Sequence, residues 1–203
     1  MIRTLIFDFG DVFINLDIEG AIQNALNVFN MPQFDADMLR TNKNYEMGLL
    51  STIEFLTFYQ NKFPELTQQD IIGAWNFMIK DFPEYRLDFL KELSRQKKFD
   101  LILLSNTNAL HIEYVKKTTE FYNSFKEQFD QFYLSHEIHL RKPESEIFTF
   151  VLRQNNFVAN ECLFIDDTKE NINTAFDLGF HTWHIDPRSD DVINLFESCN
   201  ALF

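Results

Sequence analysis

The sequence predicts an α/β fold in which a Rossmann-like parallel sheet is covered by helices and a small all-helical cap is inserted after the first strand. The first observation is that short apolar runs, at 5–7, 101–104, 132–134 and 162–165, alternate with segments of helical periodicity. Runs that are apolar on both faces indicate buried strands, and their alternation with helices indicates a parallel sheet covered on both sides. The second observation is that residues 35 to 80 carry helical patterns only.

Length and composition indicate a globular chain of one domain or slightly more. The chain has 203 residues, of which 45% are hydrophobic, and this content can fill a core. Its formal charge of -13 argues against binding to nucleic acid or to an anionic membrane, because both require clustered Lys and Arg. An acidic protein that binds phosphate must therefore supply positive charge locally, from a metal ion or a placed lysine.

The sequence indicates no targeting or membrane-spanning segment. It has no positively charged region followed by a long apolar stretch at its start, and no apolar run of about 18 residues. The two cysteines, Cys162 and Cys199, form no zinc-binding pattern. A reducing, cytoplasmic setting is the expectation. The oligomeric state is not readable from the sequence.

The first strand leads directly into a carboxylate. Residues 5–7 are apolar, Asp8 follows at once, and Gly10 and Asp11 lie just beyond it. In an open α/β sheet, ligands bind just past the carboxyl ends of the strands, so Asp8 lies where such folds place their chemistry. Taken alone, the stretch also fits an Asp that merely starts a turn.

The segment after this strand reads as a helical insertion. Residues 51–54 and 67–70 are capping-box patterns, and each opens an apolar helical segment. No strand pattern interrupts the region. The sequence therefore predicts an α/β core of residues 1–14 and 85–203, with a helical cap of residues 15–84 inserted after the first strand.

Strand and helix alternate again beyond residue 84. The expected order is a helix from Tyr85, a strand at 101–104, a helix through Val115, a strand at 132–134, a helix after Pro143, a strand at 162–165, a helix from about 169 that closes at Gly179, and a last strand at 182–185. Polar residues follow three of these strands directly or after a short loop: Ser105-Asn106, Arg141-Lys142 and Asp166-Asp167.

Each of these polar groups alone has an ordinary explanation as a cap or a solvated loop. Together, and in this order, they resemble the four motifs of the haloacid dehalogenase superfamily, most of whose members are aspartate-nucleophile phosphatases. The matching positions are a strand followed by Asp8, a strand followed by Ser105, a lysine at a helix start, Lys142, and a strand followed by the paired acids Asp166 and Asp167. The resemblance covers the chain from residue 5 to about 180.

The local sequence resembles one branch of that superfamily in particular. The stretches LLSNTN, FYLS, RKPE and FIDDTKENI are similar to the bacterial sugar-phosphatase branch that includes glucose-1-phosphate phosphatase. Tyr45-Glu46-x-Gly48, followed by the helix at Ser51, resembles the helical cap of that branch. The resemblance implies a phosphatase whose substrate is a small phosphorylated metabolite, in particular a sugar phosphate.

The resemblance also implies how each residue type serves the chemistry. Asp8 would be the nucleophile that accepts the phosphoryl group. Because a carboxylate and a phosphate repel each other, a cation is needed between them, and an all-oxygen site suits Mg²⁺. The implied ligands are Asp8, Asp167 and the backbone carbonyl of Gly10, with Asp166 supporting the metal through its waters.

The implied phosphate-binding groups are a lysine, a hydroxyl and a backbone N–H. Lys142 would offer a compact cation to Asp8 and the phosphate. The Ser105 hydroxyl and the Asn106 backbone N–H would bind phosphate oxygens at the start of the next helix. These donors stabilise charge on the group that is being transferred.

One position departs from the family pattern. Most phosphatases of the superfamily have a second Asp two residues after the nucleophile, where it acts as general acid and base, and here that position is Gly10. The carbonyl ligand survives this change, but the acid does not. Asp11 is a candidate substitute, although a shift of one residue changes its direction. Substrates with good leaving groups, such as anomeric sugar phosphates, are favoured under this interpretation.

Two other functions remain open at this point. A haloacid dehalogenase proper also lacks the second Asp, but it attacks carbon and needs no metal, whereas the pair Asp166 and Asp167 fits a cation site better. A catalytically weak binding or regulatory protein on the same fold is the other alternative, and Gly10 is its motivation. A screen of phosphorylated metabolites with and without Mg²⁺ separates these hypotheses.

Overall fold

The computed structural model describes all 203 residues and contains a five-stranded sheet in which every strand is parallel to its neighbours. The strand order is β3-β2-β1-β4-β5, which places the first strand at the centre. The strands are β1 (Thr4–Phe7), β2 (Asp100–Ser105), β3 (Gln131–Leu134), β4 (Cys162–Asp166) and β5 (His181–His184). The predicted fold class is confirmed.

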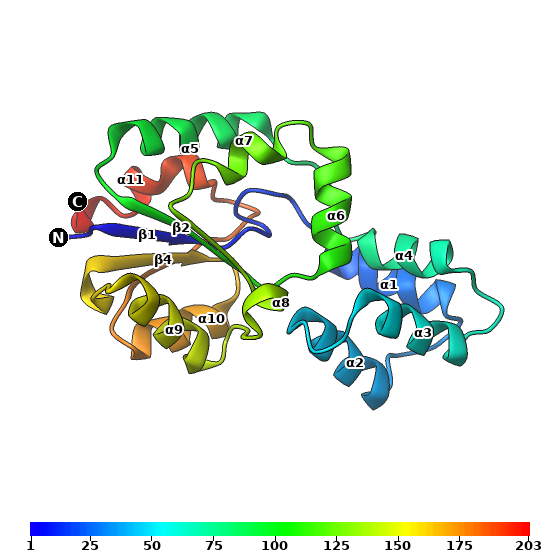
Figure 1. Ribbon diagram of the computed structural model, residues 1–203. Coiled ribbons are helices and arrows are strands. Elements are labelled where there is room, and N and C mark those ends of the chain that lie inside the picture. Colours follow the sequence, from blue (N-terminus) through cyan, green and yellow to red (C-terminus); the bar gives the residue numbers. More distant parts are fainter.

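Helices cover both faces of the sheet (Figure 1). On one face lie α5 (Glu84–Gln96), α7 (Tyr122–Lys126) and α11 (Leu195–Ser198), and on the other α8 (Ser135–Ile138), α9 (Ser145–Asn155) and α10 (Lys169–Asp177). Short 3-10 helices span Ala159–Glu161, Val192–Asn194 and Asn200–Leu202. None of the helices combines the length and the apolar character that a membrane crossing requires.

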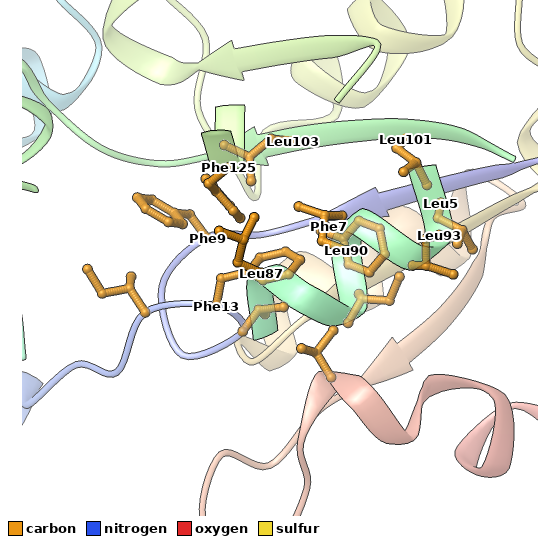
Figure 2. Close-up of a cluster of buried hydrophobic side chains, with 14 of the residues drawn as sticks. Leu5, Phe7, Phe9, Phe13, Leu87, Leu90, Leu93, Leu101, Leu103 and Phe125 are labelled. Atoms are coloured by element: carbon orange, nitrogen blue, oxygen red, sulfur yellow. The ribbon is translucent and has the colours of Figure 1, made fainter. Parts of the chain in front are cut away.

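The sheet separates two apolar cores because successive side chains of a strand point to opposite faces. Leu5 and Phe7 pack on the face covered by α5, whereas Ile6 between them packs on the opposite face. Figure 2 shows the first core, where Phe9 and Phe13 reach in from the loop after β1. The ring of Phe9 stacks on that of Phe125, with 5.3 Å between the centroids. Phe7 and Phe9 therefore anchor the backbone on both sides of Asp8.

The helical cap consists of α1 (Ile18–Val28), α2 (Ala36–Glu46), α3 (Thr52–Lys62) and α4 (Gln68–Asn76), and these helices surround an apolar core to which Leu110, outside the cap, also contributes. Both predicted capping boxes are present, at the start of α3 and at the start of α4. The cap lies beyond the carboxyl ends of the strands, and α6 (Ala109–Thr118) stands between it and the sheet (Figure 1).

Two extended connections join the cap to the sheet, and they pair with each other. Leu16 and Ile79 form an antiparallel bridge, and the Asp17 N–H donates to the carbonyl of Met78 over 2.8 Å. This pairing closes the cap into one inserted unit between β1 and α5. The predicted boundaries at 14/15 and 84/85 stay a prediction, and the paired connections support them.

The end of α2 is docked against α8 and the loop after it. Gly48 has a φ of +64°, and a Cβ there would lie 2.0 Å from the carbonyl oxygen of His136. Only glycine fits such a close backbone approach in this conformation. Nearby, His139 Nδ1 lies 2.9 Å from the carbonyl oxygen of Met47. These contacts fix the end of α2 against α8 and the residue that follows it.

Candidate active site

Three neighbouring strands bring the predicted site residues to one edge of the sheet. Asp8 follows β1 directly, Ser105 ends β2 and Asp166 ends β4. Both β2 and β4 are hydrogen-bonded neighbours of β1. Because the strands are parallel, their carboxyl ends meet at the edge that faces the cap (Figure 1). Lys142 reaches the same place from the loop before α9.

The Lys142 ammonium is the buried centre of the cluster. The residue is 0% exposed, and Nζ donates to the carbonyl oxygen of Leu104 over 2.8 Å and to Asp166 Oδ2 over 2.6 Å. It also lies 2.9 Å from Asp8 Oδ1 as an ion pair. Asp8 Oδ1 is buried and accepts no aligned hydrogen bond within the protein, so the nucleophile candidate keeps unused acceptor capacity.

Asp166 is fully engaged by protein donors. Besides Lys142, its carboxylate accepts hydrogen bonds from the Thr168 N–H over 2.8 Å and from Asn171 Nδ2 over 2.9 Å. In this geometry the Asp166 carboxylate holds the Lys142 ammonium in place. Sequence analysis missed Asn171, although its position in the first turn of the helix after the paired acids was an available signal.

Two of the groups proposed as metal ligands have oxygens that the protein leaves free. The carboxylate of Asp167 and the backbone carbonyl of Gly10 accept no hydrogen bond within the protein. Ligand oxygens of Asp8, Asp166 and Asp167 all lie within 4.8 Å of one another. Several hard oxygen donors gathered around uncompensated negative charge form a donor set that fits a divalent cation such as Mg²⁺.

The pKa values of the cluster also reflect an excess of negative over positive charge. Burial, and then the negative charges of Asp8 and Asp166, raise the pKa of Asp167 to about 7. Burial also raises the pKa of Asp8, and the Lys142 charge only partly offsets it. Burial disfavours the charged form of Lys142, but the attraction of Asp166 and Asp8 outweighs it and raises the pKa of the ammonium group. Three carboxylates thus share one cation.

Ser105 and Asn106 lie at the end of β2, beside the cluster. The Asn106 side chain clamps the backbone of Lys142: Nδ2 donates to its carbonyl over 2.8 Å and Oδ1 accepts from its N–H over 2.9 Å. This clamp positions the ammonium. The Asn106 N–H donates to no protein acceptor, and the buried Ser105 hydroxyl has only a 3.5 Å contact to the Asn106 carbonyl. Both donors are available to a phosphate.

Asp11 lies in a strained position next to this group. It has a φ of +52°, and its Oδ1 accepts a hydrogen bond from the Leu16 N–H over 2.9 Å. Burial raises the pKa of Asp11, and its charge contributes to the raised pKa of Asp167. One carboxylate oxygen is therefore committed to the loop, and the other accepts no hydrogen bond within the protein.

A cavity of about 260 Å³ extends from the strand ends into the cap. Gly10, Ser105 and Asn106 form its floor, and the cap helices together with α6 form most of the remaining walls. Sixteen of the 23 lining residues are hydrophobic, and among the few polar ones are Asn42 and Glu46 of α2. A mostly apolar pocket with a few placed polar groups is the usual form of a small-molecule site.

His111 also lines this cavity, and it joins the core to the cap. Its Nε2 lies 3.1 Å from the carbonyl oxygen of Trp75, its Nδ1 lies 3.1 Å from Asn108 Nδ2, and its ring stacks on the Trp75 indole. Burial lowers the pKa of His111 to about 4, so the imidazole is neutral near pH 7. Sequence analysis missed this residue, because nothing local relates position 111 to position 75.

Comparisons with known proteins agree with this geometry. A family model described as haloacid dehalogenase-like hydrolase matches residues 2–179. D-ribitol-5-phosphate phosphatase of Bacteroides thetaiotaomicron is 29% identical over 202 residues, which cover 94% of this chain and 95% of the relative.

Two solved structures are similar over nearly their whole length. A HAD family enzyme from Bacteroides thetaiotaomicron, in a complex with magnesium, is 34% identical with a TM-score of 0.84, covering 96% of this chain and 98% of that one. A HAD-like family hydrolase from Porphyromonas gingivalis is 28% identical with a TM-score of 0.81, covering 97% of each chain.

Proposed function

The chain belongs to the haloacid dehalogenase-like hydrolases, and from this premise we propose that it is a Mg²⁺-dependent phosphatase of small phosphorylated metabolites, in particular sugar or polyol phosphates. The observation that carries the proposal is the cluster of Asp8, Asp166 and Asp167 around the buried Lys142. The similarity to D-ribitol-5-phosphate phosphatase supports the choice of sugar or polyol phosphates as the substrate class.

Asp8 is the nucleophile in this proposal. One of its carboxylate oxygens forms a bond to phosphorus while the ester P–O bond breaks, and the alkoxide that leaves takes a proton from water. Water then attacks the aspartyl-phosphate, releases inorganic phosphate and restores the Asp8 carboxylate. Lys142 balances charge on Asp8 and the phosphoryl group throughout, held by Asp166 and by the Asn106 clamp.

Asp8, Asp167 and the Gly10 carbonyl would hold the cation, because the Asp167 carboxylate and the Gly10 carbonyl accept no hydrogen bond within the protein and Asp8 is engaged only by the ion pair with Lys142. Asp166 would support the cation through the water molecules bound to it. When bound, Mg²⁺ supplies the positive charge that lets a carboxylate approach a phosphate. The Ser105 hydroxyl and the Asn106 N–H bind the phosphate oxygens.

Phosphate release is the test of this proposal. Wild type, Asp8→Asn and Asp167→Ala are assayed on D-ribitol 5-phosphate, glucose 1-phosphate and phenyl phosphate, with Mg²⁺ and with a chelator. We expect turnover by wild type only with Mg²⁺, none by Asp8→Asn with its fold intact, and a steeply raised Mg²⁺ requirement for Asp167→Ala. Near-wild-type activity of Asp8→Asn would remove Asp8 from the mechanism. Full activity in chelator, with halide release from a 2-haloacid, would favour the dehalogenase alternative.

A further inference from the structure

The cavity above the strand ends has two unlike walls. Its apolar wall comes mainly from α1, α4 and the connections between cap and sheet, with Ile18, Ile22, Trp75 and Met78 among its residues. Its polar wall includes Asn42 and Glu46, both from α2. A ligand in this cavity therefore meets apolar surface over most of its area and hydrogen-bonding groups at one helix.

Asn42 and Glu46 are four residues apart on α2, so their side chains project from the same face of the helix. Asn42 Oδ1 accepts a hydrogen bond from the Tyr59 hydroxyl over 2.6 Å, which leaves both Nδ2 donors without a partner in the protein. Glu46 Oε2 pairs with Arg141 Nη2 at 3.1 Å, which leaves Oε1 without a protein donor. Each side chain is thus fixed by one oxygen and offers its other atom: a donor from Asn42, an acceptor from Glu46.

The same contacts fix this pair relative to the phosphoryl site. Arg141, which holds the Glu46 carboxylate, directly precedes Lys142 in the chain. The backbone carbonyl of Glu46 lies 2.6 Å from the hydroxyl of Ser135, and that hydroxyl also accepts a hydrogen bond from the N–H of Thr107 in the loop after β2. The polar wall is therefore tied to the loops that carry the phosphate-binding groups.

We propose that Asn42 and Glu46 are specificity-determining residues that bind the hydroxyl groups of a phosphorylated polyhydroxy compound, a proposal that rests on the phosphatase function above. A hydroxyl group can donate to Glu46 and accept from Asn42, and the carbon chain that bears it has C–H surface for the apolar wall.

The test compares the hydrolysis of two phosphate esters by variants in which Glu46 or Asn42 is replaced by a residue of the same shape. Glu46→Gln keeps an oxygen for Arg141 and turns the free acceptor into a donor, and Asn42→Asp keeps an oxygen for Tyr59 and turns the free donor into an acceptor. For each variant, kcat/KM is measured with D-ribitol 5-phosphate and with phenyl phosphate, which has no hydroxyl. We expect the ratio of the two values to fall by about 10- to 100-fold, the effect of losing a hydrogen bond to a charged or buried partner.

Glu144→Gln is the matched control. Glu144 of the core forms an ion pair at 2.8 Å with Lys43, which lies in α2 as Glu46 does. This pair also joins the cap to the core, but neither residue lines the cavity. If Glu46 only helps to hold the cap in place, Glu144→Gln lowers the ratio as much as Glu46→Gln does, and the proposal is overturned. If Glu46 binds hydroxyls, the ratio in Glu144→Gln stays within about twofold of wild type.

Calorimetry gives a readout that does not depend on turnover. In the Asp8→Asn background with Mg²⁺, adding Glu46→Gln should raise the Kd for D-ribitol 5-phosphate by about 10- to 100-fold. An unchanged Kd overturns the proposal. If wild type hydrolyses neither ester, the phosphatase function fails, and this Kd comparison alone decides whether the pair binds hydroxyls.

Discussion

Lys142 Nζ lies 2.6 Å from Asp166 Oδ2, and both side chains are completely buried. The same nitrogen lies 2.9 Å from Asp8 Oδ1, so one buried ammonium group forms ion pairs with two carboxylates. Removing one member of a buried charge cluster leaves the others unpaired, and this is far worse than losing an ion pair at the surface.

We therefore predict that Lys142→Met lowers the free energy of unfolding by about 3–5 kcal/mol and lowers kcat by about 10²–10³-fold. Urea unfolding followed by circular dichroism measures the first effect, and phosphate release measures the second. Lys43→Met is the control, because Lys43 makes an exposed ion pair with Glu144 and its loss should cost less than about 1 kcal/mol. Equal losses in the two variants would contradict the structural importance of Lys142.

Asp167 gives the protein a distinctive pH dependence. In the unfolded chain its carboxyl group loses its proton near pH 4, whereas in the fold the pKa is raised to about 7. Between these values the folded state binds more protons than the unfolded state. The free energy of unfolding of the Mg²⁺-free protein should therefore fall as the pH rises from about 4 to about 7, and the raised pKa of Asp8 acts in the same direction.

Urea unfolding in chelator at several pH values checks this prediction. Asp167→Asn should reduce the slope, because the amide does not ionise. Mg²⁺ should restore stability increasingly as the pH rises, since it binds the deprotonated carboxylates and only the folded state gathers them. If the free energy of unfolding of wild type does not change with pH, and Asp167→Asn behaves in the same way, the fold does not raise the pKa values of these carboxyl groups as we describe.

The docking of the cap at Gly48 leads to a stability prediction. Gly48→Ala places a methyl group 2.0 Å from the His136 carbonyl oxygen and forces a residue with a Cβ into a left-handed conformation. The conformation alone costs about 1–2 kcal/mol, so the Tm should fall by roughly 4 °C or more. A differential scanning calorimetry comparison measures the shift.

Gly73→Ala provides the matched control for this prediction. Gly73 lies inside α4, and a Cβ there meets no atom within 4 Å. Alanine should stabilise the helix at this position by about 0.5–1 kcal/mol. If both alanine variants change the Tm in the same direction, the close approach at Gly48 does not govern how the cap docks.

Residues at strand ends could be predicted from the sequence because a local pattern is enough to find them. Once the runs before Asp8, Ser105 and Asp166 are identified as parallel strands, their carboxyl ends must share one edge of the sheet. The contacts made by side chains across long separations could not be predicted. The clamp between Asn106 and the backbone of Lys142 spans 36 residues, and the predicted role of Asn106 involved only its N–H.

The polar wall of the cavity was hidden from sequence analysis for a related reason. Asn42 and Glu46 lie in a helix whose sequence gives no sign of which face meets the core. Tertiary contacts orient the helix, among them those of Met47 with His139 and of Gly48 with His136, which join residues about 90 positions apart. Glu46 was noted only through a resemblance, and its pairing with Arg141 depends on the fold.

The absence of an acid at Gly10 leads to the last prediction, which concerns the leaving group. Without an acid at this position the alcohol must depart with little proton assistance, and the loss of a general acid typically costs 10²–10⁴-fold. Rates across a series of phosphate esters should then depend strongly on the pKa of the leaving alcohol. Gly10→Asp should flatten this dependence by supplying the acid.

The structure allows that substitution to be made. A Cβ at Gly10 would lie 2.6 Å from Leu16 Cδ1, which is the end of a flexible side chain and can rotate aside. The alternative is that Asp11 already supplies the proton through the carboxylate oxygen that Leu16 leaves free. In that case wild type shows a shallow dependence, and Asp11→Asn, which keeps the acceptor for the Leu16 N–H, slows poor leaving groups selectively. A shallow dependence together with an inert Asp11→Asn variant would contradict both explanations, because another group or water would then have to deliver the proton.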